Sequence, residues 1–317
     1  MKRVRRLNLK KVAIFILILI SIVVFAIVGI KKIIEDKKMK QTYEYKFAQI
    51  GYNENEIKRL KEKFNESELN ALLLKEYNKN YINLIDNEYF DFNNLDKYVQ
   101  YMEANMVEAS KAIRIINLGV DKDWYSEIEQ TDTSKGELMI VNKFNALSND
   151  YVPELVLVSS SYAYANKYVS ITLYEDLKAL IDAAKASNFK LVVTQGYRSY
   201  KNQEETYNSY KSAYGMSDAD EIAARPGHSE YQTGLSVDIE PYNKKVEDVT
   251  TSEEHQWLMN NSYKYGFILR YEKDTEYLTG FNYNPWRFRY VGKSAAGEIH
   301  TKGLTFDEYY NYYVNEG

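Results

Sequence analysis

The sequence predicts an α+β protein in which helices pack on a small, mainly antiparallel sheet, preceded by a transmembrane helix and a small helical domain. Three observations support this fold class. A long apolar run follows a basic N-terminus, polar segments with helical periodicity come next, and short strand-like segments then alternate with helices. The expected domains are residues 1–33, 34–135 and 136–317.

The apolar run covers residues 12–30 and is interrupted only by Ser21 and Gly29. As a helix it is roughly 28 Å long, which is enough for the hydrocarbon core of a bilayer. A cleaved signal peptide is the alternative, but this run is longer than a signal peptide's apolar region and no A-x-A pattern follows it. Six basic residues within positions 1–11 predict a cytoplasmic N-terminus. We therefore expect a single-pass signal anchor in the cell membrane, with the C-terminal domain extracellular.

The charge balance differs between the two sides of this segment. Residues 1–32 hold eight basic residues and no acidic ones, which leaves 33 basic and 45 acidic residues in the remainder. An acidic outer part argues against nucleic acid as a partner. The chain has no cysteine, which excludes disulfides and thiolate metal sites.

The segment 34–135 is polar and mostly helical in pattern. Asn53 is suited to cap a helix whose first turn is acidic, and further amphipathic candidates lie at 66–75, 94–102 and 107–116. No cluster of metal-ligating or nucleophilic residues stands out in this segment. We expect a small helical stalk domain that lifts the following domain off the membrane.

The domain from residue 136 onward contains both helical and strand-like patterns. The expected helices are 173–186, 202–214, 252–265 with Ser252 as its cap, and 305–314. The expected strands are 190–196, 267–271 and 286–291. Such a mixture favours helices packed against a small sheet.

The stretch 225–240 joins a turn to a further strand. Pro226 and Gly227 break the chain, and Leu235, Val237 and Ile239 then alternate with polar residues as in a half-buried strand. Asp238 lies among these apolar residues. A carboxylate there needs a cation or hydrogen-bond donors, because an unpaired buried charge is very costly. A structural salt bridge would satisfy it, and so would a metal ion.

Four motifs occur in order along this domain: Q-G-Y-R-S-Y at 195–200, S-E-Y-Q-T-G-L-S-V-D-I at 229–239, Y-G-F-I-L-R-Y at 265–271 and P-W-R-F-R-Y-V-G at 285–292. Together they resemble the VanY-type D-alanyl-D-alanine carboxypeptidases, zinc enzymes that trim peptidoglycan stem peptides. The resemblance covers about residues 136 to 310, and four ordered motifs are far more specific than one short pattern. It implies the same α+β fold.

The chain departs from this family at the metal site. By the resemblance, positions 231 and 238 correspond to a histidine and an aspartate that bind zinc, but position 231 is Tyr231 and only Asp238 is kept. The catalytic glutamate corresponds to Asn284, and the third zinc ligand, a histidine, corresponds to Arg287. No catalytic or metal site is therefore expected to be intact.

The substituted residues cannot perform the family's zinc chemistry. Zinc needs imidazole, thiolate or carboxylate donors, whereas Tyr231 is protonated at neutral pH and Arg287 is always a cation. Asn284 cannot act as a general base. We expect no cofactor. The cation of Arg287 and the anion of Asp238 balance each other, which predicts that the two pair, with the Tyr231 hydroxyl nearby.

The resemblance also implies residues that contact the peptide. Arg198 helps to hold the substrate in the family, and a guanidinium suits a carboxylate bidentately. By their motif positions, Gln203, Ser229 and Thr233 are expected in the same groove. The alternative for Arg198 is that it only ties its turn to the sheet.

Two functions remain open. The first is a zinc-free pseudoenzyme that binds peptidoglycan stem peptides or a cell-wall protein. The second is an active metallo-carboxypeptidase that cleaves a terminal D-alanine with a metal site rebuilt from His228, Asp238 and His300. His255, expected in the first turn of a helix, is the remaining histidine.

Overall fold

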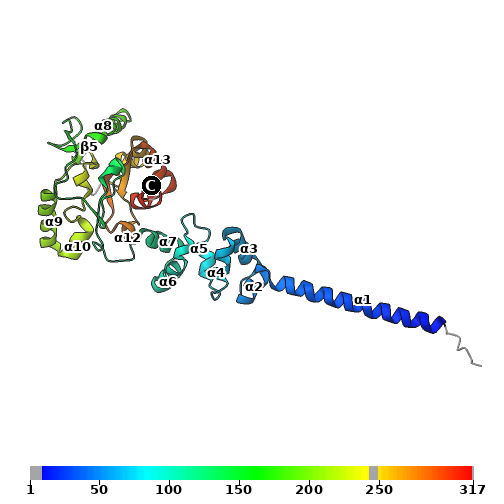
Figure 1. The fold of residues 1–317 in the computed structure, drawn as a ribbon. Coiled ribbons are helices and arrows are strands. Elements are labelled where there is room, and N and C mark those ends of the chain that lie inside the picture. Colours follow the sequence, from blue (N-terminus) through cyan, green and yellow to red (C-terminus); the bar gives the residue numbers. More distant parts are fainter. Residues whose placement is uncertain (1–8, 243–248, 316–317) are drawn as a thin grey trace, which may run out of the picture. The chain divides into compact units, whose positions relative to one another are not determined.

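The computed structural model describes residues 9–242 and 249–315 of the chain. They form two compact units, divided between Ala112 and Ile113, and each unit is described by itself. Most of the basic tail expected in the cytoplasm, residues 1–8, lies outside the described residues. Figure 1 shows the elements of both units in sequence colours.

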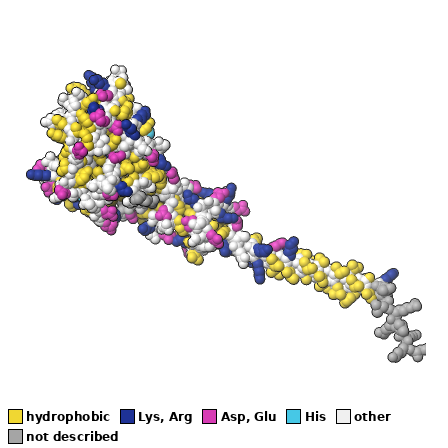
Figure 2. Space-filling view, turned by 45° about the horizontal axis from the view of Figure 1, so that its top comes forward, with side chains coloured by type: hydrophobic (Ala, Val, Ile, Leu, Met, Phe, Trp, Pro, Cys, Tyr) yellow, Lys and Arg dark blue, Asp and Glu magenta, His cyan; other side chains and the backbone are white. Residues whose placement is uncertain are grey.

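The first element is one long helix, α1 (Leu9–Lys40). Its 32 residues make it about 48 Å long. The side chains from Ile14 to Ile30 are exposed, and Figure 2 shows apolar side chains covering this stretch. The helix is long and apolar enough to cross a membrane, a property that a signal sequence near an N-terminus shares.

The remainder of the first unit consists of short helices. They are α2 (Tyr43–Ile50), α3 (Glu54–Lys63), α4 (Glu66–Leu72), α5 (Lys79–Leu84), α6 (Leu95–Asn105) and the start of α7 (Ala109–Leu118). Asn53 caps α3 as expected, with Glu56 completing a capping box, and Asn65 and Glu68 repeat this arrangement at α4. Phe47, Leu60, Leu72, Leu84 and Tyr98 are buried in this unit.

The second compact unit begins earlier than the boundary that we expected at residue 136. Residues from Ile113 onward belong to it, and Arg114 forms an ion pair of 2.5 Å with Glu308 near the C-terminus. Helix α7 ends at Leu118, so the segment from there to the expected boundary is not a continuation of the helical stalk.

A four-stranded antiparallel sheet organises the second unit. Its strands are β5 (Leu191–Gln195), β6 (Ser236–Pro241), β8 (Asn284–Tyr290) and β7 (Phe267–Tyr271), in that spatial order. Each neighbouring pair is antiparallel. Two small pairs accompany it, β1 (Glu129–Gln130) with β2 (Asn145–Ala146), and β3 (Leu155–Leu157) with β4 (Tyr168–Ser170). The predicted α+β class with a mainly antiparallel sheet is confirmed.

The helices of this unit match the sequence expectation in part. They are α8 (Ile171–Ala186), α9 (Tyr200–Tyr214), α10 (Met216–Ile222), α11 (Glu253–Asn261), α12 (Glu276–Thr279), α13 (Lys293–Lys302) and α14 (Phe306–Tyr309), the last continuing as a π-helical segment, Tyr310–Val314. Four of them, α8, α9, α11 and α14, match the sequence expectation, whereas α10, α12 and α13 were not expected. Ser252 accepts a hydrogen bond from the amide of His255, which confirms the predicted cap.

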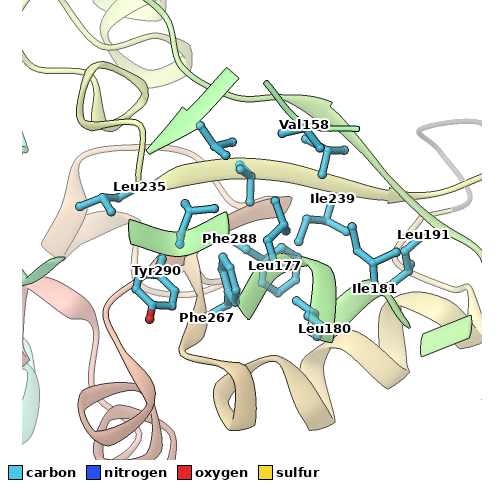
Figure 3. Close-up of a cluster of buried hydrophobic side chains, with 14 of the residues drawn as sticks. Val158, Leu177, Leu180, Ile181, Leu191, Leu235, Ile239, Phe267, Phe288 and Tyr290 are labelled. Atoms are coloured by element: carbon cyan, nitrogen blue, oxygen red, sulfur yellow. The ribbon is translucent and has the colours of Figure 1, made fainter. Parts of the chain in front are cut away.

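The main core lies between one face of the sheet and helices α8 and α11. Val237 and Ile239 of β6, Phe288 of β8, and Leu177 and Leu180 of α8 belong to it, and Figure 3 labels most of these side chains. Because side chains alternate along a strand, the polar residues of β6 face the opposite side. That side is also covered, so Ser236 and Asp238 are buried, and the expectation of a half-buried strand was wrong.

Candidate functional site

A row of polar side chains crosses the sheet on the face away from the main core. Gln195 of β5 lies opposite Asp238 of β6, which in turn lies opposite Arg287 of β8. Residues opposite each other in an antiparallel sheet have neighbouring side chains. The strand register therefore brings Asp238 and Arg287 together, although 49 positions separate them in the sequence.

Asp238 and Arg287 form the ion pair that the charge balance predicted. The Arg287 Nε donates to Asp238 Oδ1 at 3.2 Å. The Tyr231 hydroxyl donates to Asp238 Oδ2 at 2.5 Å and accepts a hydrogen bond from Arg287 Nη2. Both carboxylate oxygens are thus occupied by protein donors, and the predicted three-residue cluster is confirmed.

Burial decides the protonation of this cluster. It raises the pKa of the Tyr231 hydroxyl well above its usual range, and the neighbouring Asp238 carboxylate adds to this shift against the opposing effect of Arg287. Burial lowers the pKa of Arg287, but Tyr231 and Asp238 outweigh it and raise the pKa overall. Tyr231 is therefore a neutral phenol and Arg287 a guanidinium, and both face the Asp238 side chain.

These residues do not fit a zinc ion. A cation would have to displace the Arg287 guanidinium from Asp238, and the neutral phenol of Tyr231 is not among zinc's usual donors. Asn284 lines the same cavity, and its Oδ1 is buried without a hydrogen-bond partner among the described residues. An uncharged carboxamide at this place cannot take a proton from water.

The structure does not assemble the alternative metal site from His228, Asp238 and His300. His228 Nδ1 lies 2.8 Å from the backbone oxygen of Asn142, and His300 stacks on the ring of Tyr263 at 3.8 Å. Within residues 9–242 and 249–315, no three His, Cys, Asp or Glu side chains are grouped to hold a metal.

His255, the third histidine, is held by the backbone. Its Nε2 lies 2.9 Å from the backbone oxygen of Pro285. Burial lowers the pKa of His255, as it does for His228, which favours neutral imidazoles that bond to carbonyls.

A cavity of about 410 Å³ opens over the polar row. Arg198, Gln203 and Ser229 line it together with the cluster. Arg198 Nη1 donates to Gln203 Oε1 at 3.0 Å, and Gln203 Nε2 donates to the Ala224 carbonyl at 2.7 Å. Gln203 therefore fixes the guanidinium, and three of the four residues expected at the groove are found there.

Arg198 carries a positive charge that no carboxylate compensates directly. Burial lowers its pKa, and in the described part of the chain no Asp or Glu oxygen lies within salt-bridge distance of it. Its guanidinium lies 4.7 Å from the centre of the Tyr231 ring, and that of Arg287 lies 4.3 Å from it. A half-buried guanidinium without an ion-pair partner among the described residues is suited to bind an anionic group.

Thr233, the fourth expected groove residue, serves the turn before β6 instead. Its hydroxyl donates to the Glu230 carbonyl at 2.6 Å and accepts from the Leu235 amide at 2.9 Å. It is buried and is not among the residues that line the cavity. Thr233 therefore does not line the cavity that Arg198 lines.

The sequence reasoning missed two acidic residues of the cavity wall. Glu230 is buried, and its Oε1 accepts from Arg270 Nε at 2.6 Å and from Arg289 Nη1 at 3.0 Å. Glu240 lies two positions beyond Asp238, and its Oε1 accepts from the Thr194 hydroxyl at 2.5 Å. Because side chains alternate along β6, Glu240 lies on the same face as Asp238. This spacing of two residues could have identified Glu240 from the sequence.

Comparison with known proteins finds similarity to carboxypeptidases. A family model described as VanY, D-alanyl-D-alanine carboxypeptidase, matches residues 166–293, a range that includes the cluster of Tyr231, Asp238 and Arg287 and the cavity residues Arg198 and Asn284. The putative carboxypeptidase YodJ of Bacillus subtilis (strain 168) is 35% identical over 205 residues, which cover 60% of this chain and 75% of YodJ.

Solved structures show the same similarity. The LdcB LD-carboxypeptidase, described as revealing the molecular basis of peptidoglycan recognition, matches with a TM-score of 0.55 and 36% identity over 58% of this chain and 90% of its own. A vancomycin-resistance D,D-pentapeptidase VanY solved with Zn(II) matches with a TM-score of 0.48 and 34% identity, over 55% of this chain and 98% of its own.

Proposed function

This chain belongs to the VanY D-alanyl-D-alanine carboxypeptidase family, and from this premise we propose that it is a membrane-anchored, extracellular member that binds peptidoglycan stem peptides without hydrolysing them. It would act as a zinc-free pseudoenzyme of the cell wall. Its binding site would be the cavity over β5, β6 and β8, and its ligand would be a peptide with a free C-terminal carboxylate.

The observation that carries this proposal is the cluster of Tyr231, Asp238 and Arg287. The guanidinium holds the one carboxylate that the family keeps as a zinc ligand, and the phenol occupies that carboxylate's second oxygen. Asn284 cannot replace a glutamate as a general base. Binding residues are retained in the same cavity, while groups that would activate water are not.

Arg198 is the proposed anchor for the peptide. A guanidinium offers several N–H donors in a fixed plane, which matches the two oxygens of a carboxylate. Only one of its nitrogens donates to a described side chain, that of Gln203. The other donors would face the ligand, and the partial burial of Arg198 would strengthen the interaction.

Helix α1 supports the proposed location. Its apolar stretch forms a helix that is long enough to span a bilayer. The basic residues that precede it favour a cytoplasmic N-terminus under the positive-inside rule. The peptide-binding unit would then lie outside the membrane, where cell-wall peptides occur.

The test combines zinc content, turnover and binding on the purified full-length protein in detergent. We expect no stoichiometric zinc, no release of D-alanine from D-alanyl-D-alanine peptides with zinc added, and weak but measurable peptide binding. Arg198→Gln should abolish this binding, because the carboxylate loses its cation. Lys201→Gln removes an exposed cation at the start of α9, three residues after Arg198. This variant should leave the peptide affinity unchanged.

Two outcomes would contradict the proposal. Zinc-dependent release of D-alanine that Asp238→Asn abolishes would show an active metallo-carboxypeptidase. Absence of peptide binding, with the fold of the protein intact by circular dichroism, would show that the cavity does not serve stem peptides.

A further inference from the structure

The cavity holds a second charged group, Glu240, that has no ion-pair partner among the described residues. Its carboxylate lies on the cavity side of β6 and accepts one hydrogen bond from Thr194 through Oε1. Among residues 9–242 and 249–315, no Lys, Arg or His nitrogen lies within ion-pair distance of it. Glu240 is half-buried, so an approaching cation would be only partly screened by water.

The charged residues that line the cavity fall into two groups. Asp238 and Arg287 neutralise each other, and Glu230 is neutralised by two buried arginines outside the lining. Within the described parts of the chain, neither Arg198 nor Glu240 forms an ion pair with an opposite charge. The cavity therefore presents one receptor for an anion and one for a cation.

The strand register places these two receptors on opposite sides of Asp238. Gln195 of β5 pairs with Asp238, and because the strands are antiparallel, Arg198 follows toward the beginning of β6. The Arg198 amide donates to the Tyr231 carbonyl, just before β6. Glu240 lies toward the end of β6, about 6.6 Å from Asp238 between Cα atoms. A ligand anchored at Arg198 would pass over the Asp238–Arg287 pair to reach Glu240.

We propose that this cavity selects peptides that carry a free amino group as well as a C-terminal carboxylate, with Glu240 receiving the ammonium. The inference rests on the proposed peptide-binding function and names the ligand class of that site. A peptide whose amine is acylated, as it would be after cross-linking to another peptide, loses the charge that Glu240 attracts. The protein would then distinguish free peptides from acylated ones.

The experiment compares two ligands that differ only at this amine. Both are N-acetylated lysyl-D-alanyl-D-alanine peptides, one with a free side-chain amine and one with that amine acetylated. Binding to the full-length protein can be followed by tryptophan fluorescence, because Trp286 lines the cavity. We expect the free amine to bind roughly threefold to tenfold more tightly, a preference that falls with added salt.

Two variants separate the effect of the Glu240 charge on peptide binding from the effect of removing any carboxylate from the protein. Glu240→Gln keeps the shape and the hydrogen-bond acceptor for Thr194, and it should remove the preference while leaving the affinity for the acetylated peptide unchanged. Glu204→Gln removes an exposed carboxylate of α9 and should leave the preference intact.

Each other outcome has a distinct meaning. Equal affinity of the two peptides for the unmodified protein overturns this inference and leaves the peptide-binding function standing. Weaker binding of both peptides to Glu240→Gln, with the preference retained, also overturns it, since Glu240 would then only support the wall. No binding of either peptide contradicts the proposed function itself.

Discussion

At the scale of single residues, the site contains two side chains that compensate each other in charge. A buried carboxylate such as Asp238 needs a positive partner, and Arg287 supplies it from the neighbouring strand. The Asp238 side chain is 10% exposed and that of Arg287 is 20% exposed. An ion pair in such surroundings adds little net stability over apolar residues, but the loss of one partner leaves an uncompensated charge.

This reasoning predicts the stability of variants at the pair. Arg287→Met should lower the free energy of unfolding by about 2–3 kcal/mol, because Asp238 keeps only the Tyr231 hydroxyl. The double variant Arg287→Met, Asp238→Leu should lose clearly less than the sum of the two single changes. Urea unfolding followed by tryptophan fluorescence measures this, since all three tryptophans lie in residues 113–317.

The matched control is Lys201→Met, an exposed cation outside the cavity, which should change the free energy by less than about 0.5 kcal/mol. If the losses in the double variant were additive, Arg287 and Asp238 would have no interaction free energy. The explanation that their opposite charges stabilise each other would then be wrong.

At the scale of elements, strand β6 and the turn before it position the site. Gly234 has a φ of +67°, and an added Cβ would lie 2.8 Å from the backbone nitrogen of Ser170. The turn thus needs a glycine for two reasons, its backbone conformation and the close approach of the segment that enters α8. Thr233, which the sequence suggested as a groove residue, stabilises this turn through two hydrogen bonds.

Alanine at Gly234 should therefore be costly. The positive φ alone costs roughly 1–2 kcal/mol for an L-residue, and the contact with Ser170 adds about 1–3 kcal/mol because the backbone must shift. Gly303→Ala is the matched control, since Gly303 has a φ of +63° with no atom within 4 Å of an added Cβ. Urea unfolding should show a larger loss for Gly234→Ala; equal losses would rule out the steric part.

At the scale of the whole molecule, a basic tail, an apolar helix and an acidic remainder follow one another along the chain. The apolar side chains of α1 are exposed to solvent in the structure, which in water would be unfavourable over such a length. A bilayer is the environment that such a helix suits.

We predict that the protein fractionates with membranes. Protease added outside intact cells should remove the part after residue 33, because the anchor would leave it exposed. A protein with a cytoplasmic domain of similar abundance serves as the control and should stay intact. A shortened, soluble product in the medium would instead indicate a cleaved signal peptide, and full protection would indicate the opposite orientation.

The sequence alone determined the longer helices, the strands of the main sheet and the residue types at the site. Helix caps, strand alternation and glycine turns are local properties, and the types of residue at positions 231, 284 and 287 already exclude the usual zinc donors. The tertiary structure decided which side chains meet. The antiparallel register brings Asp238 and Arg287 into contact and places Glu240 in the cavity wall. Thr233 instead forms hydrogen bonds within the turn before β6. These outcomes depend on contacts between segments far apart in the chain, and such contacts are set by how whole elements pack.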